Sequence, residues 1–184
     1  MKLNCRKNKI LSHKKLISLG ILVLAVWLLS ELPCAAVDVS VTAKVTVEQV
    51  FTLSVDRDAI DFYNMKPGES RYDIPPTGIR VTTKSNTGNP WYLKLRALEP
   101  LTSGRNTIPN ENFKWYGWTE GSGTWYGTGK DNLLATPVVA YASSLSEGLN
   151  AAPGVANVFK FKLDVPQNQA AGNYETTVQF VLTE

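Results

Sequence analysis

A cluster of aromatic side chains is the first candidate for binding chemistry. Residues 113–127, FKWYGWTEGSGTWYG, contain six aromatic rings and four glycines in fifteen positions. Exposed Trp and Tyr rings stack on the apolar C–H faces of sugars, and they are also common where proteins contact one another. The same rings can pack inside their own domain. The stretch therefore predicts either a contact surface or an aromatic part of the core.

The order of residues in this stretch separates the rings into two faces. Successive side chains of a β-strand point to opposite faces, so Phe113 and Trp115 share one face and we expect them in the core. The segment TEGSG can turn the chain and TWYGT resumes the aromatic pattern, which predicts a β-hairpin. The candidate ligand-binding platform consists of Tyr116 and Trp118 on the outward face and one of Trp125 and Tyr126. These last two residues lie on opposite faces of their strand, and the sequence does not show which of them points outward.

Carboxylates offer a second kind of chemistry. Asp56, Asp58 and Asp61 fall within the segment DRDAID, and clustered carboxylates can hold Ca²⁺. The segment lacks the central Gly and terminal Glu of an EF-hand, and Asp is also common in turns. A glycosidase needs two carboxyl groups at a defined separation, and the sequence singles out no pair. We expect no metal and no cofactor, and a carboxylate-dependent glycoside hydrolase is a remote alternative.

The first 36 residues have the composition of a secretory signal peptide. Positions 1–15 carry six basic residues and no acidic residue, and the apolar run 16–29 is interrupted only by Ser18 and Gly20. This run is short for a helix that spans a bilayer. Cys34-Ala35-Ala36 supplies the small residues of a cleavage site. We predict that residues 1–36 are removed after Ala36, so that membrane contact is limited to export; an uncleaved N-terminal anchor is the alternative.

Removal of the signal changes the charge and the chemistry of the remaining domain, residues 37–184. The chain has 19 basic and 16 acidic residues; six basic residues and one acidic residue lie in the signal, which leaves 13 and 15. This balance disfavours nucleic-acid binding. Cys5, Cys34 and the one histidine, His13, also lie in the signal. The domain therefore lacks the residues for a disulfide, a Cys nucleophile, a Cys/His metal site or a Ser-His-Asp triad, and we predict that it is not an enzyme.

The domain shows the two-residue alternation of β-strands. Apolar residues occupy every second position from Val37 to Val47, and the residues between them are polar. Phe51 to Val55 repeats the pattern, and Ile60 with Phe62 predicts a further short strand. Each such strand has one buried and one solvated face. No segment of 37–184 keeps a helical period over ten residues.

Turn signals separate the predicted strands. Pro67-Gly68 suits the central positions of a type II turn. The runs 79–84 and 91–97 flank the loop SNTGNP and predict a hairpin, and the runs 159–165 and 174–182 flank QNQAAGN and predict the last two strands. Roughly eight to ten short strands predict one antiparallel all-β sandwich or barrel over residues 37–184.

Two segments resemble a known family. TTKSNTGNPWYLKLRA, with Trp91 and Leu93, resembles the first W-x-L motif of WxL-type cell-surface domains, and IDFYNM is similar to the strand before it. The ending FKLDVPQNQAAGNYETTVQFVLTE resembles the end of those domains, where Phe180 and Leu182 stand for the second motif with Phe in place of Trp. The ending is also similar to secreted pilin-like and spore-coat-like β-sandwich subunits.

The resemblance implies an Ig-like sandwich with a non-catalytic role at the surface: attachment to wall polymer, adhesion, or assembly into a surface structure. Trp91 and Leu93 then correspond to the family's first motif, although their alternation places both on the inward face, where they would be core residues as much as binding residues.

These observations predict a non-catalytic secreted or surface-associated protein that acts in cell-surface structure, adhesion or wall attachment. Open strand edges in such a fold are available for strand addition. The alternative is a carbohydrate-binding module that uses the aromatic stretch. Expected partners are cell-wall or extracellular polysaccharide, surface proteins, or both, and the expected location is secreted, cell-surface or periplasmic.

Overall fold

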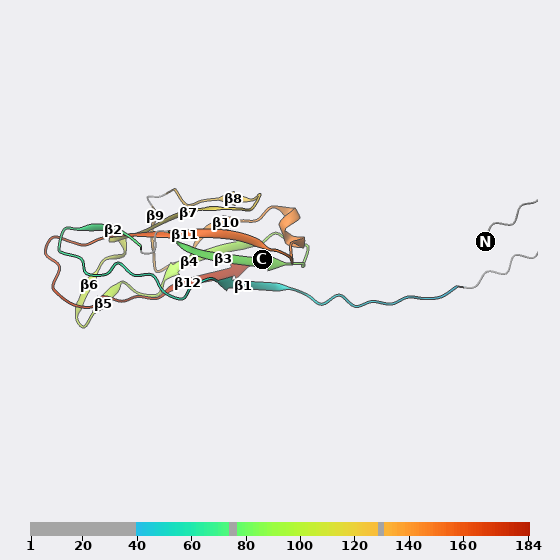
Figure 1. Ribbon diagram of the computed structural model, residues 1–184, viewed down its shortest axis with the longest axis horizontal. Helices are drawn as coiled ribbons and strands as arrows, with labels where there is room; N and C mark the ends of the chain where they lie inside the picture. The colour runs from blue at the N-terminus through green and yellow to red at the C-terminus, as the bar shows by residue number, and fades with distance from the viewer. Residues whose placement is uncertain (1–39, 74–76, 129–130) are drawn as a thin grey trace, which may run out of the picture. The chain divides into compact units, whose positions relative to one another are not determined.

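The computed structural model describes residues 40–73, 77–128 and 131–184, and the predicted all-β fold is confirmed (Figure 1). Residues 46–184 form one compact unit. The described residues contain no α-helix and therefore no helix able to cross a membrane. The predicted signal peptide lies outside the described residues. The strands and the two 3₁₀ turns are β1 (Phe51–Val55), β2 (Ser70–Tyr72), β3 (Ile79–Ser85), β4 (Tyr92–Ala97), β5 (Leu101–Ser103), β6 (Asn106–Ile108), η1 (Asn110–Asn112), β7 (Phe113–Thr119), β8 (Thr124–Trp125), β9 (Asp131–Asn132), β10 (Val138–Ala142), η2 (Leu145–Leu149), β11 (Val155–Asp164) and β12 (Val178–Thr183).

Two antiparallel sheets pack as a sandwich. The six-stranded sheet has the order β1-β3-β11-β7-β9, and β2 pairs with the end of β11 beyond β3. The four-stranded sheet has the order β12-β4-β10-β8, and β5 with β6 forms a separate two-stranded ribbon. Several of these strands have only two or three residues, which is why the sequence predicts fewer.

The core lies between the two sheets, where the inward rows of both meet. Alternation along each long strand supplies one apolar row, as in β4, whose Leu93, Leu95 and Ala97 are fully buried. Rows from β3, β7 and β11 face them from the six-stranded sheet. The largest side chains of this core are Trp91, Phe113, Trp115, Tyr141, Phe159 and Phe161.

The two sides of the sandwich are built differently. On one side Trp125 of β8 packs edge-on against Trp115 of β7, with ring centroids 5.9 Å apart, so β8 faces β7. Since the strand orders run in the same direction from there, the remaining edge strands, β1 and β12, lie together on the other side of the sandwich (Figure 1).

The predicted hairpin around SNTGNP is wrong, and the last strand predicted after QNQAAGN is shorter than expected. β3 belongs to the six-stranded sheet and β4 to the four-stranded sheet, so the loop between them crosses from one layer to the other. β11 and β12 are divided in the same way, and β12 begins only at Val178, whereas Glu175 makes a single bridge to Thr102. Alternation shows that a strand has one buried face, but this face is the same whether the chain turns beside its neighbour or crosses the core.

The strand predicted from Val37 to Val47 is also wrong over its described part. Residues 40–50 form no strand, and Val41, Val45 and Val47 are 89%, 88% and 76% exposed. Residues 37–39 lie outside the described residues. A β-strand needs a neighbour to accept and donate its backbone hydrogen bonds, and in this segment only Glu48 and Val50 have such a partner, Asn86, among the described residues.

Two of the remaining local predictions are confirmed and one is wrong. The strand Phe51–Val55 is confirmed as β1. The turn at Pro67-Gly68 is confirmed too, because the Glu69 amide donates to the Lys66 carbonyl over 3.0 Å and Gly68 has a φ of 82°. Ile60 and Phe62 form no strand; their side chains are half-buried and pack against the core from an irregular segment.

Candidate functional site

The aromatic stretch is divided between the two layers, so the predicted hairpin is wrong. β7 pairs with β11 and β9 in the six-stranded sheet, whereas β8 pairs with β10 in the four-stranded sheet. The segment Glu120–Gly123 carries the chain across. The aromatic residues before and after this crossing therefore lie on different surfaces and cannot form a single platform.

The inward and outward assignments along β7 are confirmed. Phe113 and Trp115 are each 2% exposed, Trp118 is 46% exposed, and Tyr116 is half-buried. The last two rings do point opposite ways. Trp125 turns into the core, where its centroid lies 5.1 Å from that of Phe159, and Tyr126 is exposed on the four-stranded sheet.

A buried carboxylate holds the crossing in place. Glu147 accepts hydrogen bonds from the backbone amides of Ser122 and Ser144 and from the Tyr141 hydroxyl, all between 2.7 and 2.8 Å. Burial raises the pKa of Tyr141, and the bond to Glu147 raises it further. None of the predicted sites includes this network, although the capping-box spacing Ser144-x-x-Glu147 is a sequence signal for it.

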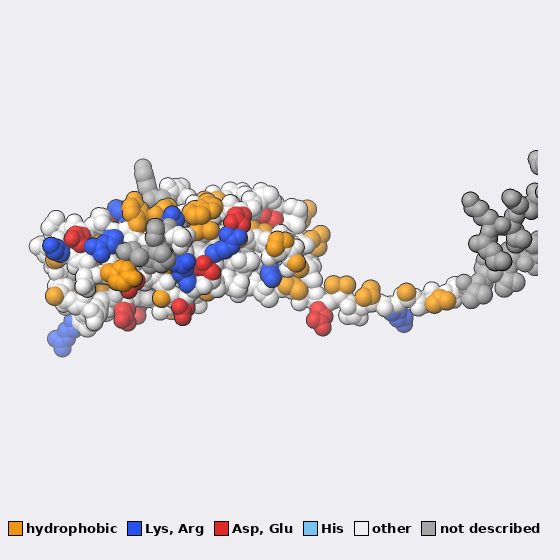
Figure 2. All heavy atoms as spheres, in the orientation of Figure 1, with side chains coloured by type: hydrophobic (Ala, Val, Ile, Leu, Met, Phe, Trp, Pro, Cys, Tyr) orange, Lys and Arg blue, Asp and Glu red, His pale blue; other side chains and the backbone are white. Residues whose placement is uncertain are grey.

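The outer face of the six-stranded sheet brings together aromatic residues that are far apart in sequence. In the strand register Tyr116 lies opposite Lys160, Trp118 lies opposite Val158, and Tyr72 lies opposite Lys162. Directly opposite residues share a face. Hydrophobic side chains lie among Lys and Arg side chains over these strands (Figure 2). We call Tyr72, Tyr116, Trp118 and Lys160 the aromatic face.

Contacts within the aromatic face join its members. The Tyr72 and Tyr116 rings meet edge-on, with centroids 5.7 Å apart and planes at 76°. The Lys160 Nζ lies 5.3 Å from the centre of the Trp118 ring, in cation–π range. Burial raises the pKa of Tyr116, and the charge of Asp73 raises it further. The Tyr116 hydroxyl therefore stays protonated at neutral pH and can donate a hydrogen bond.

Neighbouring charges are already paired. Asp164 contacts Lys162 at 2.7 Å and Lys114 at 3.2 Å, and the Ser70 hydroxyl donates to it. Burial alone would raise the pKa of Asp164, but these hydrogen bonds and the Lys162 charge outweigh burial and hold it at about 2. Lys160, by contrast, makes no ion pair with a carboxylate of the described residues, so its ammonium group is available to a ligand.

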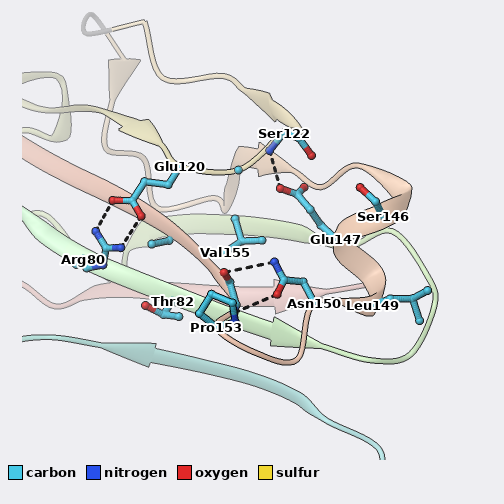
Figure 3. Close-up of a pocket in the computed structure, with 13 residues that line it drawn as sticks. Arg80, Thr82, Glu120, Ser122, Ser146, Glu147, Leu149, Asn150, Pro153 and Val155 are labelled. Atoms are coloured by element: carbon cyan, nitrogen blue, oxygen red, sulfur yellow. Dashed lines mark hydrogen bonds and ion pairs between the residues drawn. The ribbon is translucent and has the colours of Figure 1, made fainter.

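A pocket beside the aromatic face is less suited to binding. It lies between β3, the Glu120–Gly123 crossing and the loop before β11 (Figure 3). Arg80 and Glu120 pair across it through two hydrogen bonds of 2.5 Å. The bond to Arg80 lowers the pKa of Glu120, so both groups stay charged and satisfy each other. Glu147, which also lines it, is held by the crossing. The pocket's charged groups are thus committed to the fold.

The three aspartates proposed as a weak metal candidate have separate roles. Asp56 accepts a hydrogen bond from the Arg80 amide over 2.8 Å, Asp61 accepts one from the Tyr63 amide over 2.5 Å, and Asp58 is exposed. No group of three metal-ligating side chains occurs in the described residues. Asp61 thus has the turn-forming role that is common for Asp, whereas Asp56 joins the end of β1 to β3.

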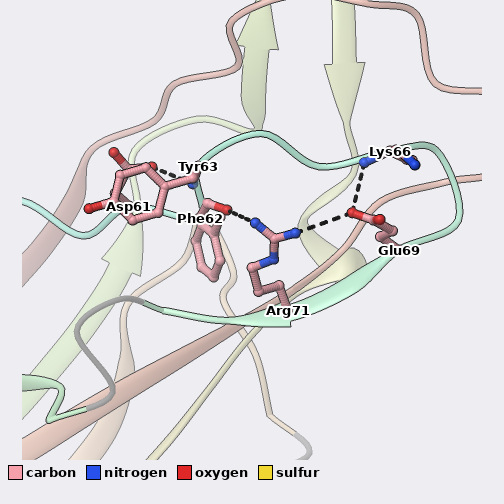
Figure 4. Close-up of polar contacts among 6 residues, drawn as sticks. All are labelled: Asp61, Phe62, Tyr63, Lys66, Glu69 and Arg71. Carbon is pink, nitrogen blue, oxygen red and sulfur yellow. Dashed lines mark hydrogen bonds and ion pairs between the residues drawn. The ribbon is translucent and has the colours of Figure 1, made fainter.

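The segment that follows Asp61 is fastened by Arg71. Its guanidinium donates to the Phe62 carbonyl over 2.8 Å and to the Glu69 carboxylate over 3.4 Å, and Glu69 also accepts from the Lys66 amide (Figure 4). These bonds attach residues 62–69 to β2 and so help to place Tyr72 at the aromatic face.

The residues of the resembling motifs belong to the core. Trp91 and Leu93 are fully buried, as their alternation predicts, and the Trp91 ring lies 5.4 Å from that of Tyr141. Phe180 and Leu182 are half-buried on the inward face of β12. None of the four contributes to the aromatic face.

Comparison with known proteins gives no match to a protein-family model and none to a curated protein. The site is therefore defined by its geometry. Tyr72 and Lys160 were missed by the sequence analysis, because they join Tyr116 and Trp118 only through the pairing of β2, β11 and β7. The alternation of Lys160 and Lys162 with Phe159 and Phe161 does show that these lysines face outward.

Proposed function

We propose that this protein is an exported, non-catalytic β-sandwich that serves in cell-surface structure or adhesion. Its aromatic face is the contact surface, and cell-wall or extracellular polysaccharide is the ligand class that this face fits best. The proposal rests on export, as the composition of residues 1–36 predicts, and on the geometry of the outer face of the six-stranded sheet.

One observation carries the choice of ligand: Trp118 is half exposed beside a cation that has no carboxylate partner among the described residues. An exposed indole offers a flat apolar surface to a sugar ring. The Lys160 amine and the protonated Tyr116 hydroxyl, within the same face, can donate hydrogen bonds to sugar hydroxyl or carboxylate groups. A shallow face of this kind suits a polymer rather than an enclosed small molecule.

The test is co-sedimentation of the purified protein with insoluble cell-wall material and a panel of polysaccharides. We expect Trp118→Ala to weaken binding by about tenfold, because one stacking contact of about 1.4 kcal/mol is removed. Tyr126→Ala is the matched control, since Tyr126 is exposed to almost the same degree, 49% against 46%, but lies on the other sheet.

Circular dichroism and a denaturation midpoint establish that both variants are folded. Equal binding by wild type, Trp118→Ala and Tyr126→Ala would show that the aromatic face is not the binding surface. No binding by any of the three proteins would refute polysaccharide as the ligand.

A further inference from the structure

We infer that residues 40–47 of one copy add as a strand to the free edge of β12 in a second copy. This is a second interaction site, separate from the aromatic face, and its partner is the same chain. It goes beyond polymer binding because it makes the protein a self-assembling subunit.

The donor segment has an apolar face with no cover. Val41, Ala43, Val45 and Val47 alternate with Ser40, Thr42, Lys44 and Thr46, so an extended chain presents all four apolar side chains on one side. The three valines are at least 76% exposed. Burying a valine side chain stabilises a complex substantially, and a segment of regular alternation is already patterned for a half-buried strand.

The segment is poorly suited to pair with its own domain. The Val50 amide donates to the Asn86 Oδ1 over 2.6 Å, and the Asn86 amide donates to the Val50 carbonyl, so the β1–β3 ladder continues outward to residue 50. Folding back along β1 would require a reversal within residues 46–50, TVEQV. This stretch has no Gly, Pro, Asn or Asp, which are the residues that form tight turns. A second copy is therefore the better acceptor.

The acceptor edge has an open apolar row of its own. β12 pairs with β4 on one side, and within the described residues nothing pairs with its other side. Val178, Phe180 and Leu182 lie opposite Ala97, Leu95 and Leu93 in the register. The β4 residues are fully buried, whereas the β12 residues are only half-buried. The apolar side chains of this part of the core are therefore fully covered at β4 and partly uncovered at β12.

The neighbouring edge is open as well. Phe51 and Leu53 of β1 point inward and are half-buried, and β1 lies on the same side of the sandwich as β12 (Figure 1). A strand added beside β12 would cover both rows with its valines and turn its polar residues to solvent. β8 and β9, at the other side, have two residues each and are too short to receive an eight-residue segment. β12 has six residues.

Donor and acceptor are different surfaces of one chain. An interface between unlike surfaces is heterologous, so each bound copy still offers a free segment and a free edge. The assembly is therefore a ring or an open filament rather than a closed two-fold dimer.

The experiment uses protein purified after expression of the full chain. Mass is measured by light scattering over a wide range of concentration, and amide hydrogen exchange is measured at low and at high concentration. The test variant is Val41→Thr/Val45→Thr/Val47→Thr, which keeps the shape of exposed side chains but removes their apolar character. The control is Thr42→Ser/Thr46→Ser on the polar face of the same segment.

We expect the measured mass of wild type and of the control to exceed that of one chain as concentration rises. The mass of the triple variant should stay equal to that of one chain at every concentration. Exchange should slow in residues 40–47 and 178–183 of the assembled protein. A synthetic peptide of residues 37–48 should bind the triple variant and slow exchange in 178–183, and the same peptide with Thr at positions 41, 45 and 47 should not.

Three outcomes would overturn the inference: a wild-type protein that remains one chain at every concentration, an assembly that the triple variant also forms, or protection at an edge other than β12. Polysaccharide binding by a protein that never assembles would refute this inference and leave the proposed function unchanged. Assembly without polysaccharide binding would support this inference and refute polysaccharide as the ligand.

Discussion

At the scale of single residues, the outer face of the six-stranded sheet separates two kinds of lysine. Lys114 and Lys162 are held by Asp164, whereas Lys160 stands beside Trp118 without a carboxylate partner among the described residues. Asp164 therefore prevents two of the three amines from competing for the same anions. Its own ionised state is stabilised by both lysines and by Ser70.

Asp164→Asn should lower the free energy of unfolding at pH 7 by about 1–2 kcal/mol. The folded-state pKa of about 2 lies below the ordinary value of 3.8, so the carboxylate stabilises the fold above about pH 4 and loses this effect as pH falls toward 2. Urea denaturation of wild type and variant over this pH range measures the difference. A difference that stays constant down to the lowest pH would show that ionisation of Asp164 is not its source.

At the scale of elements, a glycine in β7 allows the two layers to interlock. Gly117 lies on the inward face opposite Phe159, and a Cβ there would sit 1.8 Å from the Val158 carbonyl oxygen and 3.2 Å from the Trp125 ring. The missing side chain leaves the space that Trp125 enters from the four-stranded sheet. The inward turn of Trp125, and with it the outward turn of Tyr126, depends on this glycine.

Gly117→Ala should destabilise the protein by about 2–3 kcal/mol, because a backbone oxygen must move before the methyl group fits. Gly104→Ala is the control. Both glycines have a positive φ, 157° at Gly117 and 59° at Gly104, but no atom lies within 4 Å of a Cβ built at Gly104. The control should cost about 1 kcal/mol from backbone strain alone. Chemical denaturation of both variants gives the comparison, and equal losses would refute the steric explanation.

At the scale of the whole molecule, the sandwich is closed on one side by Trp125 and open on the other at β1 and β12. The compact unit spans residues 46–184, and the segment before it adds exposed valines. Stability of the isolated molecule and stability of an assembly should therefore depend on different parts of the chain.

Deletion of residues 37–45 should change the free energy of unfolding by less than about 0.5 kcal/mol in dilute protein, because the large apolar side chains of its described part, Val41 and Val45, are exposed. In concentrated protein the wild type should melt at a higher temperature than the shortened chain, since association with the folded state raises its stability by mass action. Thermal melts at two concentrations measure both effects. A shortened chain that is less stable even when dilute would mean that the segment packs on its own domain.

The sequence predicts local features of this fold better than its connections. Alternation correctly divides Phe113 and Trp115 from Tyr116 and Trp118, because the direction of a strand side chain depends only on its parity. The same alternation cannot distinguish a hairpin from a crossing, so the hairpins that it predicts for β3–β4 and β7–β8 are both wrong. Tyr72 reaches the aromatic face through β11, and no local pattern contains that pairing.

The crossings between layers also determine how the chain must fold. From β3 onward the longer strands enter the two sheets alternately, so most of their ladders join distant residues: Thr83 pairs with Val155, and Ala97 pairs with Val178. Neither large sheet is complete until β11 and β12, the last two strands, have arrived. Chains whose contacts are this non-local fold slowly, on the order of milliseconds to seconds. A newly made chain thus remains without a complete core until β11 and β12 have been added.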